Sequence, residues 1–117
     1  MAGRSDRGSI TAELALTLPA VVGLMAIVLV IGSAAVSQLA VAGGARAGAR
    51  AAALGQNDTE IQAAAQAVAG GGVTVQVSRG DGLVRVTCAR AVPVPPFGHR
   101  LAHAEAVAAC EPARGCG

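Results

Sequence analysis

The chain has 117 residues, so it can hold at most one small domain beside its long apolar segment. Its net charge is +2. Hydrophobic residues make up 53% of it, yet there is one Phe and no Trp or Tyr. Ala and Val side chains bury little area each, so the core must be thin, and we do not expect an enzyme with a deep pocket. The small, scattered charge also argues against nucleic-acid binding.

A long uncharged segment dominates the first half of the chain. About 32 residues without a charge separate Glu13 from Arg46. As a helix they would measure about 48 Å at about 1.5 Å per residue, whereas the hydrocarbon of a bilayer is about 30 Å thick. We expect one transmembrane helix over residues 13–54 that projects beyond the bilayer, with a kink near Pro19. The short Arg-containing flank 1–8 predicts that the N-terminus lies on the cytoplasmic side of the cytoplasmic membrane and that the rest of the chain lies outside.

Small residues recur at every fourth position of this helix, at Ala40, Gly44, Gly48 and Ala52. Such a stripe lets another helix approach closely. We interpret Gly44 and Gly48 as residues of an assembly surface. The competing interpretation is an Ala- and Gly-rich sequence that reaches this spacing by chance.

Beyond Gly55 the sequence predicts a short second helix. Asn57 and Glu60 have the spacing of a capping box, in which each residue satisfies a backbone N–H of the other. The glycines at 70–72 end this helix. A helix of about 12 residues needs other elements to pack against.

A small antiparallel sheet follows, so the fold class is α+β. Residues 73–78 and 83–88 alternate between apolar and polar side chains and form a hairpin around the turn 79–82, in which we interpret Arg-Gly-Asp as turn residues rather than an adhesion motif. The three prolines within 92–98 predict a loop. For residues 100–111 we favour a third strand over a helix, because a two-stranded hairpin alone is marginal in water. Such a strand would carry Leu101, His103, Glu105 and Val107 on one side.

The cysteines Cys88, Cys110 and Cys116 all lie beyond the span. In an exported region they predict one disulfide and one free thiol, and all three pairings are open, Cys88–Cys110 among them. His99 and His103 together with the cysteines match no tight zinc spacing, so we expect no metal site. The sequence also shows no nucleophile–base pair and no phosphate loop, so we expect neither a cofactor nor an enzyme.

Gly8 and Glu13 carry the sharpest functional signal. A carboxylate at the edge of the hydrocarbon is costly and normally has a partner or a task. If the chain is cut after Gly8, the new amine of Ser9 lies one turn from Glu13. An amine and a carboxylate so placed can neutralise each other across neighbouring helices, which would set the register of packed subunits. The alternatives are a plain anchor whose acidic residue is favoured by the helix dipole, and a secretory signal peptide cut near residues 33–35.

Basic residues, Gly8, an acidic fifth residue after the cut and a long apolar helix together resemble the type IV prepilin class. More narrowly, the segment GSITAELALTLPAVV, which begins at Gly8, is similar to the TadE-like group of pilin-like proteins of tight-adherence pili. The likeness covers about residues 7–54. Leu14 stands where Phe often follows the Glu, and the pattern does not account for the cysteines, so the subgroup stays open.

The resemblance implies that a prepilin peptidase cuts between Gly8 and Ser9, and that the product is a minor pilin or pseudopilin that joins or primes a pilus. The implied partners are the peptidase, other pilin and pilin-like subunits, the membrane assembly platform and the lipid bilayer, with no nucleic acid. The competing function is an unprocessed single-pass anchor that presents a small binding domain.

The expected organisation of the chain follows from this resemblance. It comprises a leader over 1–8, a transmembrane and assembly helix over 9–55, a small extracytoplasmic α+β domain over 56–111 and a tail over 112–117.

Overall fold

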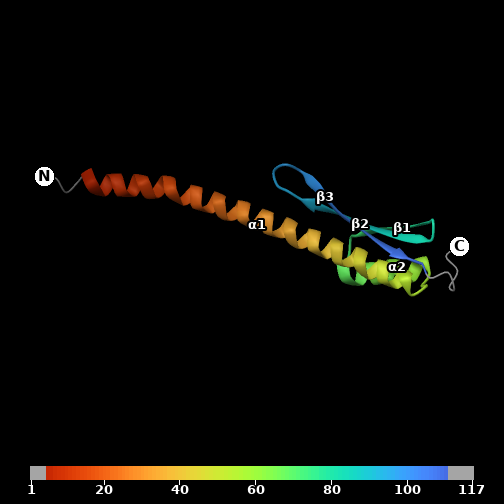
Figure 1. Ribbon diagram of the computed structural model, residues 1–117. Helices are drawn as coiled ribbons and strands as arrows, with labels where there is room; N and C mark the ends of the chain where they lie inside the picture. The colour runs from red at the N-terminus through yellow and green to blue at the C-terminus, as the bar shows by residue number, and fades with distance from the viewer. Residues whose placement is uncertain (1–4, 111–117) are drawn as a thin grey trace. The chain divides into compact units, whose positions relative to one another are not determined.

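The computed structural model describes residues 5–110, with side chains from residue 7 onward, and it has the α+β fold expected from the sequence. A long helix and a short helix precede a three-stranded antiparallel sheet (Figure 1). The expected tail and Cys116 lie outside the described residues, as do the first four residues of the leader. The elements are α1 (Ser5–Ala53), α2 (Asp58–Ala69), β1 (Thr74–Gly80), β2 (Leu83–Pro93) and β3 (His99–Ala109).

The chain forms two compact units, and α1 contributes to both of them. The first unit ends at Ser33 and the second begins at Ala34. This division differs from the domain boundary expected after residue 55. The reason is that the last turns of α1 belong to the core of the second unit, where Val41 and Ala45 are at most 1% exposed.

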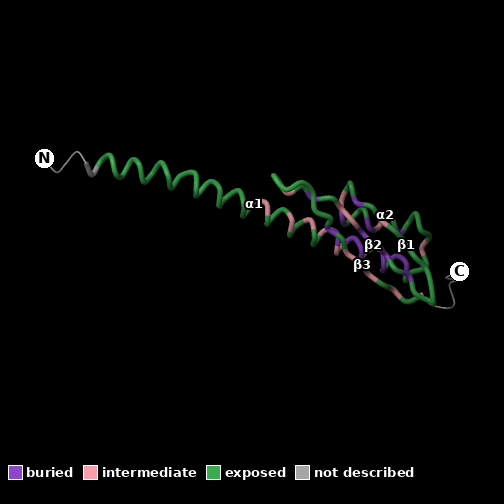
Figure 2. The backbone as a smooth tube through the Cα atoms, turned by 90° about the horizontal axis from the view of Figure 1, so that it is seen from above, coloured by how far each residue is buried: buried purple, intermediate pink, exposed green. Residues whose placement is uncertain are grey.

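In the first unit α1 is apolar on every side and buries none of its apolar window. All residues from 7 to 29 are exposed (Figure 2). The helix is long and apolar enough to cross a membrane, by length and composition. It starts earlier than expected, at Ser5, and continues through Pro19 without interruption. Near that proline, the Thr17 hydroxyl donates a hydrogen bond to the carbonyl oxygen of Glu13 at 2.6 Å.

The ends of α2 are both satisfied by side chains. At its start the expected capping box is confirmed: Asn57 Oδ1 accepts from the Glu60 N–H at 2.9 Å, and Glu60 Oε2 accepts from the Asn57 N–H at 3.0 Å. At its end, Arg90 Nη2 on β2 donates to the carbonyl oxygens of Ala69 at 2.6 Å and Gly71 at 2.8 Å. These carbonyls have no partner within the helix, so Arg90 ties the end of α2 to the sheet.

The strand order is β1-β2-β3, and the expected third strand is confirmed. A two-residue turn joins β1 to β2, because Asp81 and Gly82 both adopt positive φ angles, of 53° and 73°. The central strand places Val84, Val86 and Cys88 at 0% exposure. On β3 the alanines at even positions face the core, and the large residues expected on one side are all exposed. Those residues are Leu101, His103, Glu105 and Val107.

The loop expected over 92–98 is shorter in the structure, because pairing between β2 and β3 continues to Pro93 and His99. A proline in a central strand would interrupt the hydrogen bonds to one neighbour. The pairing of β1 with β2 ends at Ala89, however, so the last residues of β2 have β3 as their one neighbouring strand. Pro93 is therefore tolerated on a local edge.

The glycine stripe of α1 (Ala40, Gly44, Gly48 and Ala52) packs inside the second unit rather than facing another subunit. A Cβ atom on Gly44 would lie 2.6 Å from Ala69 Cβ and 2.8 Å from the Ala65 carbonyl oxygen, both on α2. A Cβ atom on Gly48 would lie 2.8 Å from Val86 Cγ1 of β2. The stripe does admit a second helix, but this helix is α2 of the same chain, so the two buried glycines are not a surface for assembly.

Two adjacent glycines provide a matched test of this packing. Gly44→Ala forces α2 away from α1, so we expect it to lower the free energy of unfolding of the second unit by about 1–3 kcal/mol. At Gly43 an added Cβ would meet only the end of the Val68 side chain, at 3.1 Å, and Val68 is 54% exposed and free to turn away. Gly43→Ala should therefore be neutral or stabilise by up to about 1 kcal/mol through helix propensity.

The measurement is urea unfolding of the full chain in detergent, followed by the circular dichroism of the sheet. Equal effects of the two substitutions would contradict the packing described.

Candidate functional site

The first turns of α1 hold the residues expected to take part in processing. The Gly8–Ser9 peptide bond lies inside the helix near its N-terminal end, and both residues are exposed. A Cβ atom added to Gly8 would meet no atom within 4 Å. The Thr11 hydroxyl, one turn further along, donates a hydrogen bond to the carbonyl oxygen of Arg7 at 2.9 Å. None of the described residues covers this peptide bond, so another protein can reach it.

Glu13 lies one turn after Ser9 on the same face of the helix, as residues four apart do. It is exposed, and within residues 7–110 its carboxylate has no hydrogen bond or ion pair. Apolar side chains follow at once: Leu14 and Leu18 are each 66% exposed and Leu16 is 78% exposed. A carboxylate therefore stands at the border of a fully apolar helical surface, with no counter-charge from its own chain in the described range.

The structure separates the residues that the sequence grouped as an assembly surface. Glu13 is open on the first unit, whereas Gly44 and Gly48 are closed inside the second. The part of α1 in the second unit still presents large apolar side chains that the sequence interpretation missed. Val36 is 67% exposed and Leu39 is 73% exposed. Their signal was their place within the uncharged run of the sequence.

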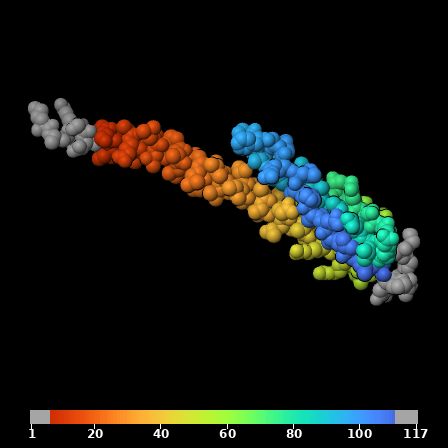
Figure 3. Space-filling model, turned by 45° about the horizontal axis from the view of Figure 1, so that its top comes forward, coloured from red at the N-terminus to blue at the C-terminus, as the bar shows by residue number. Residues whose placement is uncertain are grey.

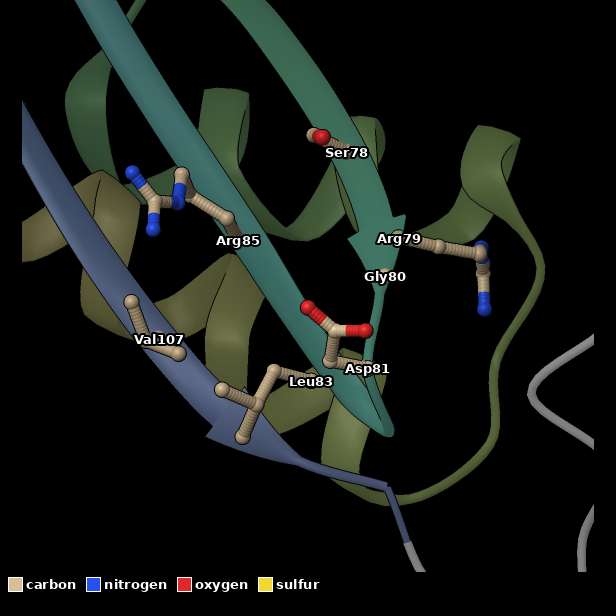
Figure 4. A pocket seen from close by; sticks show the side chains of 7 residues that line it. All are labelled: Ser78, Arg79, Gly80, Asp81, Leu83, Arg85 and Val107. Carbon is tan, nitrogen blue, oxygen red and sulfur yellow. The ribbon is translucent and has the colours of Figure 1, made fainter.

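A hollow of about 280 Å³ lies on the sheet beside the turn between β1 and β2 (Figure 4). The two arginines at its rim are already paired: Arg79 bonds to Asp58 at the start of α2, and Arg85 Nη1 lies 3.1 Å from Glu105 Oε1. Asp81, between them, is exposed. An open hollow whose cations are neutralised and whose remaining carboxylate is in water offers no activated group for catalysis.

The expected cysteine and histidine chemistry is settled in part. Cys88 has a free thiol, so the pairings Cys88–Cys110 and Cys88–Cys116 are wrong. Cys110 is disulfide-bonded. The reason for the correction is position, because the side chain of Cys88 points into the core beneath the central strand. Within the described part of the chain, no three His, Cys, Asp or Glu residues gather as a metal site would require.

Comparison of the chain with protein-family models, with curated proteins and with solved structures found no match.

The buried thiol of Cys88 predicts a pH dependence of stability. Burial raises the pKa of this thiol above its ordinary value of 9.0. The folded state therefore holds the proton more tightly than the unfolded state. This contribution is fully present below about pH 9 and is lost as the pH rises through the raised pKa. The chain has no Lys or Tyr to titrate in the same range.

We expect the second unit to lose stability as the pH rises above about 9, and Cys88→Ala to remove this alkaline loss. Urea unfolding of the full chain in detergent at a series of pH values measures both. A variant with the same alkaline slope as the wild type would contradict the assignment to Cys88.

Proposed function

We propose that the chain is a minor pilin-like or pseudopilin-like subunit that a prepilin peptidase processes after Gly8, and that joins or primes a tight-adherence type IV pilus. The observation that carries this proposal is the combination of Glu13 and the Gly8–Ser9 bond. A single carboxylate without a partner among the described residues lies one turn from an open peptide bond, just before the apolar window of α1, which is exposed on every side.

The position of the bond favours cleavage. A peptidase needs a locally unwound substrate, and the ends of helices fray because their backbone groups lack partners. Gly8 weakens this end further, since glycine costs up to about 1 kcal/mol relative to alanine in a helix. The apolar helix that follows holds the substrate in the bilayer, so the bond is presented at the cytoplasmic surface.

Cleavage would change the charge at this end of α1. The product begins with the amine of Ser9, which is positive at neutral pH and lies four residues before Glu13. In the low dielectric at the edge of the hydrocarbon, a carboxylate on one helix attracts an amine on the next far more strongly than in water. The pair would neutralise both charges and fix the axial register of packed helices.

The apolar surface supports two successive environments for α1. With residues 7–29 exposed on all sides, this part of the helix needs lipid around it first. Other pilin helices could later replace the lipid, because their surfaces are equally apolar. The second unit has its own core and would not cross the hydrocarbon.

Processing is tested with a pair of glycine variants. Gly8→Leu should abolish cleavage, whereas Gly23→Ala, which also places its Cβ in open space, should be cleaved as the wild type is. The measurement is the intact mass of the membrane-extracted protein from cells with and without the peptidase. Both variants keep the fold, so a difference between them reports recognition. A wild-type chain that retains its leader in cells with the peptidase would favour the unprocessed single-pass anchor.

The role of Glu13 in assembly is tested by Glu13→Gln. We expect normal cleavage but at least a tenfold loss of the subunit from sheared pili, since a charge pair at the hydrocarbon edge is worth more than about 1.4 kcal/mol. The control is Asp81→Asn, which makes the same chemical change at an exposed turn of the second unit and should leave assembly intact. Normal incorporation of the Glu13→Gln subunit into pili would contradict the proposed pairing of Glu13 with the Ser9 amine.

A further inference from the structure

The loop between β2 and β3 carries the only Phe of a chain that has no Trp or Tyr. Phe97 is 86% exposed, and Leu101 at the start of β3 is 69% exposed. We call residues 93–101 the hairpin tip. Figure 3 shows it, in blue, projecting from the second unit. Two large apolar side chains so close together in water are unfavourable unless another surface covers them.

The hairpin tip lies at the end of the second unit where α1 enters. Gln38 Nε2 donates a hydrogen bond to the His103 carbonyl oxygen at 2.9 Å. Ten residues later along α1, Gly48 contacts Val86, which pairs with Ala106. Along this part of α1, β3 therefore advances from His103 to Ala106 and runs in the same direction as the helix. The residues before His103, and with them the tip, lie toward the start of the unit.

In the proposed function α1 enters the second unit from the membrane, so the end of this unit that carries the tip would face the bilayer. The inference rests on that proposed membrane placement of α1.

The backbone of the tip is suited to a poorly hydrated environment. Three of the residues within 93–97 are prolines, which have no N–H. The other two donors are bonded: the Val94 N–H to the Gly98 carbonyl oxygen and the Phe97 N–H to the Val94 carbonyl oxygen, each at 2.7 Å. No backbone donor in this stretch is left for water, so lipid can cover these N–H groups without a lost hydrogen bond.

The charge around the tip has one sign. No carboxylate occurs between Asp81 and Glu105. His99 and Arg100, next to the apolar side chains, are exposed and have no ion-pair partner within the described residues. Exposed Phe and Leu beside the cationic side chain of Arg100 are the composition with which proteins bind anionic membrane surfaces.

We propose that the hairpin tip docks into the headgroup region of an anionic bilayer, the same one that α1 spans, with Phe97 and Leu101 at the hydrocarbon border and Arg100 on the lipid phosphates. The second unit would then have two attachments to the membrane. The second attachment must be released when α1 leaves the bilayer.

A single-Trp variant tests this directly, because the chain has no Trp of its own. Phe97→Trp, in the full chain reconstituted into vesicles of phosphatidylcholine and phosphatidylglycerol, should emit at shorter wavelength than Trp in water. It should lose most of its emission when the lipids are brominated near the headgroup end of their acyl chains. Adding Arg100→Gln to this variant should weaken the quenching severalfold in these vesicles.

Two further variants separate this proposal from the proposed function. Leu83→Trp places the Trp at the opposite end of the sheet, where Leu83 is 45% exposed, and this Trp should keep its emission in brominated lipid. Leu24→Trp, in the middle of the apolar window, should be quenched. Quenching at Leu24→Trp with none at Phe97→Trp would overturn the docking of the tip alone. No quenching at Leu24→Trp would overturn the membrane placement of α1 and this inference together.

Discussion

An apolar helix that its own chain does not cover must be covered by something else. Over residues 7–29, α1 leaves large aliphatic side chains exposed on every side. Transfer of such surface from water to an apolar phase is worth about 25 cal/mol per Å², so no stable state of the protein leaves it in water. Every functional statement about this chain depends on what surrounds α1: lipid, other helices, or lipid first and other helices later.

The second half of the same helix forms part of a protein core. There its side chains are so small that α2 and β2 can approach the backbone at Gly44 and Gly48. A core built from Ala and Val gains little from each residue, so close approach supplies the contacts that larger side chains would otherwise provide. Arg90 and the capping box then satisfy the ends of α2. One continuous helix thus serves as a core element at one end and as an apolar segment without protein cover at the other.

The sequence predicted the elements because their signals are local. The uncharged run, the capping residues at Asn57 and Glu60 and the alternation of the strands each need only neighbours along the chain. It failed where the answer depends on which segments meet in space. The spacing of Gly44 and Gly48 indicates that another helix can approach α1 closely, but it does not indicate that this helix is α2. The free thiol of Cys88 likewise follows from the direction of one side chain of a central strand, which the spacing of cysteines does not contain. At the N-terminal end, the residues predicted from sequence are found open and close together, because both the peptide bond and Glu13 lie within two turns of one helix.

The absence of Lys makes the central claim directly measurable. After cleavage, the amine of Ser9 would be the only primary amine in the subunit. A zero-length carbodiimide coupling applied to assembled pili, followed by mass spectrometry of mixed light- and heavy-isotope subunits, reports which carboxylate lies beside that amine. The account predicts an amide between Glu13 and the N-terminal amine of an adjacent subunit. Subunits that still begin at Met1, or Glu13 left uncoupled while carboxylates of the second unit react, would contradict it.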